Sequence, residues 1–148
     1  MRLQKDLREF IGLLNSHGAE YLIVGGYALA FHGVPRYTGD IDLFVRASPE
    51  NAARVERALT AFGFSSLGLS ANDFVRPSGV IQIGLPPNRI DLLTSITGVD
   101  FDEAWAGRAP GELDGIPVCF IGRADFVKNK RATGRAQDRA DLERLGER

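Results

Sequence analysis

Two aspartates in an apolar strand, placed shortly after a glycine pair, constrain this chain more than any other feature. Residues 21–24, YLIV, form an apolar run of strand length and character. Gly25 and Gly26 interrupt that run, and residues 27–32 can form about two helical turns before Pro35 ends them. The pattern predicts a strand, a glycine turn and a short helix, followed by a second strand.

The second strand carries Asp40 and Asp42. Two residues apart on a strand, their side chains point to the same face, ~6.6 Å apart along the backbone. Ile41, Leu43 and Val45 alternate with them and are expected to face a core. Neighbouring carboxylates repel each other, and a cation between them removes that cost. Mg²⁺ prefers oxygen ligands and commonly also binds substrate phosphates, so the pair predicts a metal site.

The glycine turn offers a place for those phosphates. Backbone N–H groups at a helix N-terminus bind anions, and a glycine lets a phosphate approach because it has no Cβ. Arg36 supplies a cation between the glycines and the aspartates, and Thr38 lies beside it. The order of an anion cradle, a cation and a carboxylate pair is more specific than any of the three alone.

Composition limits the class of protein. A chain of 148 residues with 44% hydrophobic and 25% charged residues suits a single domain spanning 1–148, with the C-terminal helices as part of it. Its net charge of −1 argues against a general nucleic-acid binder. Residues 123–148 nevertheless hold 8 basic and 5 acidic residues, which indicates either an anion-binding segment or a solvated helical face.

The single cysteine and the hydropathy profile indicate the compartment. Cys119 has no partner for an internal disulfide, which favours a reducing, cytoplasmic location, and its apolar neighbours predict a buried thiol. No apolar run approaches the length needed to cross a membrane, and residues 1–6 are not typical of a signal peptide.

The rest of the chain predicts helices alternating with strands. Ser48 is the expected cap of a helix that Gly63 ends, and Gly134 separates the last two helices. The patterns predict helices at 2–17, 49–62, 102–106, 124–132 and 136–145, a helical turn near 70–73, a hairpin of strands 80–84 and 89–96, and a strand at 116–121. This order indicates an α+β fold with a short mixed sheet and helices packed on it.

Asp91 stands among Ile90, Leu92 and Leu93 in one of these strands. A carboxylate in an apolar strand is costly unless it is paired or bound to a metal. Asp91 is therefore either a third metal ligand or the partner of Arg89 or Arg36 in a salt bridge.

These motifs resemble the nucleotidyltransferase superfamily with the DNA polymerase β-like fold, and particularly its small bacterial members such as the AbiEii-type toxins. The likeness covers residues 20–45, 89–95 and 126–145. It rests on the glycine pair, on Arg-x-Thr-x-Asp-x-Asp and on a later strand with an aspartate. The C-terminal region adds a lysine, an arginine and an Asp-x-x-Asp pattern, matched here by Lys130, Arg135, Asp138 and Asp141.

The resemblance implies a reaction and a set of roles. A nucleoside monophosphate would move from an NTP to an acceptor hydroxyl, with release of pyrophosphate, at two Mg²⁺ (or Mn²⁺) ions held by Asp40, Asp42 and Asp91. Nucleotide-binding residues would be Gly25, Gly26, Tyr27, Arg36, Thr38 and Lys130, with ATP among the candidate substrates. The implied sheet has helices on one side.

Several alternatives stay open at this point. The acceptor could be tRNA, a protein side chain or a small molecule, and a toxin–antitoxin role would add a partner protein encoded nearby. The oligomeric state is undetermined. Tyr27 follows the glycines where toxin-like relatives often have a short hydroxyl residue, which favours a second class of function: a non-catalytic nucleotide- or partner-binding module. The three aspartates favour the enzyme.

Overall fold

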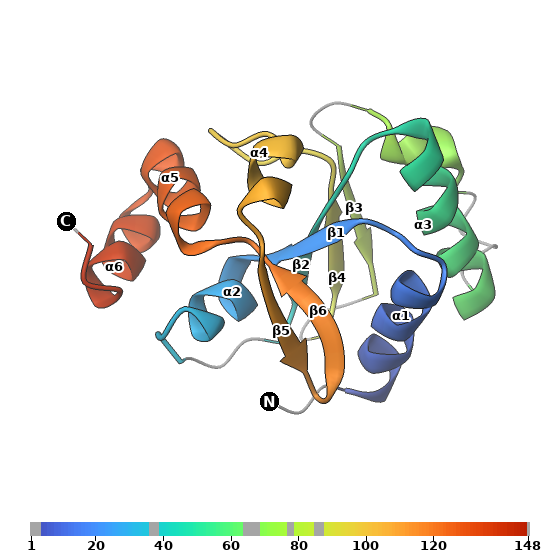
Figure 1. Cartoon of the computed structure of the whole chain (residues 1–148), viewed down its shortest axis with the longest axis horizontal. Helices are drawn as coiled ribbons and strands as arrows, with labels where there is room; N and C mark the ends of the chain where they lie inside the picture. The colour runs from blue at the N-terminus through green and yellow to red at the C-terminus, as the bar shows by residue number, and fades with distance from the viewer. Residues whose placement is uncertain (1–3, 36–38, 64–68, 77–78, 85–87, 148) are drawn as a thin grey trace.

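A six-stranded mixed sheet forms the centre of the protein in the computed structural model, which describes residues 4–35, 39–63, 69–76, 79–84 and 88–147 (Figure 1). The strand order is β3-β4-β2-β1-β6-β5. The central pairs β2–β4 and β1–β6 are parallel, whereas β1–β2, β3–β4 and β5–β6 are antiparallel. The strands are β1 (Tyr21–Val24), β2 (Ile41–Val45), β3 (Val80–Ile83), β4 (Ile90–Leu93), β5 (Ala109–Leu113) and β6 (Ile116–Phe120).

In the part of the chain that the structure describes, six α-helices and a short 3-10 helix are arranged around this sheet. They are α1 (Lys5–Ser16), α2 (Gly25–Phe31), α3 (Pro49–Phe62), η2 (Ala71–Phe74), α4 (Phe101–Ala106), α5 (Arg123–Thr133) and α6 (Ala136–Arg144). Figure 1 shows α1 and α3 together at one end of the molecule, and α2, α5 and α6 at the other. None of the described helices combines the length and the apolar character that crossing a membrane requires.

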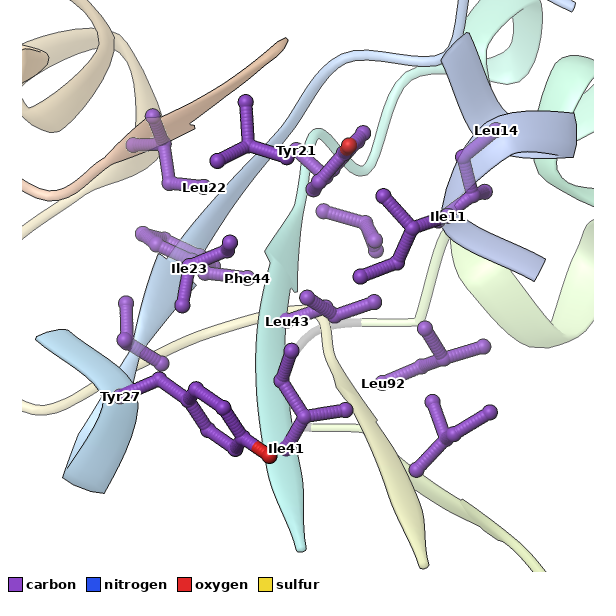
Figure 2. Packing of buried hydrophobic residues seen from close by; sticks show 14 of the residues in the cluster. Ile11, Leu14, Tyr21, Leu22, Ile23, Tyr27, Ile41, Leu43, Phe44 and Leu92 are labelled. Carbon is purple, nitrogen blue, oxygen red and sulfur yellow. The ribbon is translucent and has the colours of Figure 1, made fainter. Parts of the chain in front are cut away.

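Helices α1 and α3 cover one face of the sheet. The apolar stripe predicted for the first helix is buried at Leu7, Phe10, Ile11 and Leu14. Figure 2 shows Ile11 and Leu14 on the side of the sheet where Leu43 and Leu92 point. Phe10 meets Phe62 of α3 edge-on, with 5.6 Å between the ring centroids. Alternation along the strands therefore places the residues between the aspartates in a core, as the sequence pattern predicts.

The opposite face is also covered, which differs from the one-sided arrangement that the resemblance implied. Phe44 lies between Leu43 and Val45 on β2 and points to the other side of the sheet (Figure 2). It packs edge-on against Phe101 of α4, with centroids 5.1 Å apart. A strand that is apolar on both sides needs cover on both sides, and α4 and α5 occupy the face that carries Asp42.

The predicted elements are confirmed, with differences at their ends and one omission. The Ser48 hydroxyl accepts a hydrogen bond from the N–H of Asn51, Gly63 ends α3 with φ 100°, and β3 and β4 pair as the predicted hairpin. Strand β5 is absent from the sequence prediction because Pro110 and Gly111 are poor strand formers. It forms as an edge strand, where proline is tolerated, by pairing with β6. Cys119 is only half-buried, because it occupies the opposite face of β6 from the buried Val118 and Phe120.

Candidate active site

Asp42 and Asp91 lie side by side where two parallel strands begin. The register of β2 against β4 pairs Ile41 with Ile90 and Asp42 with Asp91. On its other side Asp42 pairs with Val24, the last residue of β1, next to which α2 begins. The two aspartates are about fifty residues apart in the sequence, and the parallel pairing of β2 with β4 brings them together.

The electrostatics of the pair favour one proton or one cation. Burial, then the charge of Asp91 and a hydrogen bond with it, and then the charge of Asp40, raise the pKa of Asp42 from 3.8 to about 6. The positive charge of Arg89 acts in the opposite direction but is outweighed. When neighbouring groups disfavour the ionised form of a carboxylate, a cation bound beside it stabilises that ionised form.

Asp40 joins this pair through Arg89. The carboxylate of Asp40 accepts a hydrogen bond from the backbone N–H of Arg89, at 2.8 Å from Oδ1. The Arg89 guanidinium holds both oxygens of Asp91, with Nε 2.7 Å from Oδ1 and Nη2 3.1 Å from Oδ2, and Nη2 is 3.7 Å from Asp40 Oδ2. The salt bridge between Asp91 and Arg89 that the sequence left open is therefore present.

Gly25 packs tightly against the carboxylate of Asp42. Its φ is +68°, and a Cβ built on it would lie 2.2 Å from Asp42 Oδ2. Glycine is required here both by the backbone conformation and by the approach of the aspartate. The start of α2 and the aspartate pair thus form one compact arrangement, as the order of the motifs predicts.

The other predicted nucleotide-binding residues have varied positions. Gly26 lies in the first turn of α2. The side chain of Tyr27 is 5% exposed and belongs to the core (Figure 2), so only its backbone can face a phosphate. Arg36 and Thr38 lie outside the residues that the structure describes.

A cleft of about 660 Å³ extends from the aspartates toward the C-terminal helices. Gly25 and Asp42 line one end of it, and the other lining comes from the segment after β4 and from α5. Lys130 lines the cleft from α5, so the structure places the predicted lysine and the predicted aspartate around one space. That space is large enough for a small ligand.

Lys130 is held by the acidic pair on α6. Its Nζ lies 3.0 Å from Asp138 Oδ1 and 3.7 Å from Asp141 Oδ2, and its side chain is 13% exposed. Arg135 and Thr133 also donate hydrogen bonds to Asp138. Burial alone would raise the pKa of Asp138, but these hydrogen bonds and the charge of Lys130 hold it well below its usual range. The Asp-x-x-Asp pattern therefore fixes the position of the lysine.

Sequence reasoning missed the wall of the cleft between β4 and α5. Ser95, Thr97 and Asn129 line it, and Asn129 Nδ2 donates to the Thr97 carbonyl oxygen at 2.8 Å. Gly98 packs so closely that a Cβ there would lie 2.6 Å from the Cβ of Ala132. The available signal was the polar sequence directly after an apolar strand, together with an asparagine beside the lysine.

The donors at this site fit a hard divalent cation in type. Asp40, Asp42 and Asp91 offer only oxygen ligands, and Asp42 is ionised at a cost that a cation would remove. Within the described residues, no group of three or more His, Cys, Asp or Glu side chains is already arranged around a metal position. The Arg89 guanidinium instead lies between Asp91 and Asp40.

Comparisons with known proteins identify the fold. The chain is similar in structure to TM1012 from Thermotoga maritima, which is described as a putative nucleotidyltransferase. The superposition has a TM-score of 0.63 at 18% sequence identity and covers 96% of this chain and 91% of the other. The chain has the nucleotidyltransferase fold. No protein-family model and no curated protein matches the sequence.

Proposed function

We propose that this protein is a nucleotidyltransferase that moves a nucleoside monophosphate from an NTP to an acceptor hydroxyl and releases pyrophosphate. The observation that carries the proposal is the pairing of Asp42 with Asp91 at one end of a cleft that Lys130 also lines. The fold shared with TM1012 supports the same class of reaction.

The position of each residue in the site suggests its role in the reaction. The start of α2, with Gly25 against Asp42, would receive the triphosphate, and Lys130 would neutralise its charge from the opposite wall. Asp138 and Asp141 would keep the lysine directed into the cleft rather than into solvent. Asp91 arrives from the strand beside Asp42, and would lie nearest the acceptor hydroxyl and take its proton.

Asp40, Asp42 and Asp91 would hold Mg²⁺ or Mn²⁺. When bound, two such ions lower the pKa of the attacking hydroxyl and neutralise the charge of the leaving pyrophosphate. The raised pKa of Asp42 supports this assignment, because burial and then the neighbouring charges of Asp91 and Asp40 disfavour its ionised form.

The direct test is transfer of label from each of the four α-labelled NTPs to total cell RNA or lysate protein, with Mg²⁺ or Mn²⁺. We expect Asp42→Asn and Asp91→Asn each to remove transfer, and Asp91→Asn to keep NTP binding in a melting assay. Glu112→Gln, an exposed substitution on edge strand β5, is the matched control and should transfer normally.

Two outcomes would contradict the proposal. Normal transfer by Asp91→Asn would show that this carboxylate takes no part in the reaction. The second is that, with Mg²⁺ or Mn²⁺, none of the NTPs donates label to an acceptor and none raises the melting temperature of the wild-type protein at millimolar concentration. The site would then bind no nucleotide. A melting shift without transfer to any acceptor would instead favour the non-catalytic binding module.

The likeness to AbiEii-type toxins adds a narrower proposal, that the activity acts on a cellular target within a toxin–antitoxin pair. Its support is the C-terminal pattern of Lys130, Arg135, Asp138 and Asp141, which the structure joins by ion pairs. Induced expression should then slow growth for the wild-type chain and not for Asp42→Asn. Equal growth of both strains would remove the toxin role and leave the transferase proposal standing.

A further inference from the structure

One arginine contacts two of the three aspartates at the site. Arg89 donates from Nε and Nη2 to the two oxygens of Asp91, and its backbone N–H donates to Asp40. Its Nη2 also lies 3.7 Å from the second oxygen of Asp40. The arginine side chain is 26% exposed and that of Asp91 is 11% exposed, so solvent screens this pair only in part.

The position of Arg89 follows from the strand register. Ile41 donates its N–H to the carbonyl oxygen of Arg89, which places the residue before β4 level with the residue before β2. Arg89 and Asp91 are two residues apart, so their side chains share one face of the extended chain. The arginine is therefore built into the same parallel pairing that brings the aspartates together.

A divalent cation at this site would meet that positive charge. The guanidinium of Arg89 places a positive charge within hydrogen-bond distance of the carboxylate oxygens, and like charges repel. The same repulsion acts on any other cation that binds the same oxygens, and more strongly on a double charge. The negative charge of a triphosphate would offset the repulsion.

We propose that Arg89 is a positioning residue that acts as the internal counter-ion of Asp40 and Asp91 and lowers the affinity of the site for a free divalent cation. The cation then binds firmly only together with the nucleotide. The inference rests on the proposed function and deepens it, because it makes metal binding depend on the triphosphate.

The test is titration of the nucleotide-free protein with Mn²⁺, following free Mn²⁺ by electron paramagnetic resonance. We expect Arg89→Gln to bind Mn²⁺ at least about tenfold more tightly than the wild type, and Arg89→Lys to stay near the wild type because the charge remains. The double variant Asp42→Asn with Arg89→Gln should bind Mn²⁺ no more tightly than the wild type.

Arg46 provides the matched control. Like Arg89, it contacts two acidic residues, Glu20 and Asp102, and its side chain is 24% exposed, but it lies at the far end of β2. Arg46→Gln should leave Mn²⁺ affinity unchanged. If Arg89 had a purely structural role, Arg89→Gln would lower stability but would not tighten Mn²⁺ binding.

The outcomes separate this inference from the proposed function. If Arg89→Gln binds Mn²⁺ no better than the wild type, while the wild type binds Mn²⁺ with an NTP, the counter-ion role is wrong and the transferase proposal stands. If no variant binds Mn²⁺ with or without an NTP, both fail. If Arg89→Gln does not fold, Arg89→Met and the rise in melting temperature with Mn²⁺ decide instead, and a rise no larger than that of the wild type overturns the inference.

Discussion

Two pairs of aspartates near the cleft have opposite surroundings. Asp138 and Asp141 on α6 are 1% and 0% exposed, and Lys130, Arg135, Thr133 and Gln137 supply their hydrogen bonds and charges. Asp42 and Asp91 on the sheet lie beside each other, and among the described residues Arg89 supplies a positive charge that opposes their repulsion. The pKa of Asp138 is lowered, whereas that of Asp42 is raised.

The difference distinguishes a pair that stabilises the fold from the pair at the candidate active site. A carboxylate with a lowered pKa stabilises the fold in its ionised form, and its removal leaves partners without a counter-charge. A carboxylate with a raised pKa destabilises the fold when ionised, and such groups are characteristic of functional sites. Three substitutions test this contrast, in order of decreasing effect on the free energy of unfolding.

Asp138→Asn should have the largest effect. It removes a buried charge that holds Lys130 and Arg135, and breaking a buried ion pair costs about 3–5 kcal/mol. We expect a loss near the lower end of that range in urea unfolding at pH 7, because Asp141 still faces the lysine. Glu9→Gln, which removes an exposed ion pair with Lys5, is the control and should change stability little. A change below about 0.5 kcal/mol for Asp138→Asn would mean that this network does not stabilise the fold.

Asp42→Asn should stabilise the metal-free protein, with a pH dependence of defined sign. The unfolded chain ionises this group near pH 3.8, and the folded protein near pH 6, so the folded state binds more protons between those values. The wild-type free energy of unfolding therefore falls as pH rises from about 4 to 6 and then stays lower. About two pKa units, reduced for partial exposure, correspond to ~1–3 kcal/mol gained by the variant at pH 8.

The measurement is urea unfolding of Asp42→Asn and wild type at pH 4 and pH 8 in the presence of a chelator. The variant should differ little at pH 4 and be more stable at pH 8. A variant that is less stable than the wild type at both pH values would place Asp42 with the scaffold pair and would remove the contrast.

Arg135→Gln should have the smallest effect. Its guanidinium lies 2.8 Å from Asp138 Oδ2, but its side chain is 72% exposed, so solvent weakens the pair. Exposed ion pairs contribute ~0.2–1 kcal/mol, and we expect a loss of that size in urea unfolding at pH 7. A loss as large as that of Asp138→Asn would show that Arg135, rather than Lys130, is the main partner of the acidic pair.

Local patterns were sufficient for most elements of the fold. The stripe of Leu7, Phe10, Ile11 and Leu14 predicts α1 because a helix repeats every 3.6 residues, and the Ser48 cap and Gly63 predict both ends of α3. Strand β5 could not be predicted in this way, because its residues have low strand propensity and only pairing with β6 stabilises them.

For the site, the sequence by itself singled out the candidate residues: a glycine pair, Asp40 and Asp42 two residues apart, Asp91 in a later strand, and Lys130 with its acidic partners. Spacing along a strand or helix sets which face a side chain occupies, and this depends only on nearby residues. Only the tertiary structure decided that Asp42 pairs with Asp91, that Arg89 also reaches Asp40, and that Asn129 and the loop after β4 complete the cleft. These contacts join segments about 30 to 50 residues apart, and strand register and helix packing, which no local pattern encodes, bring them together.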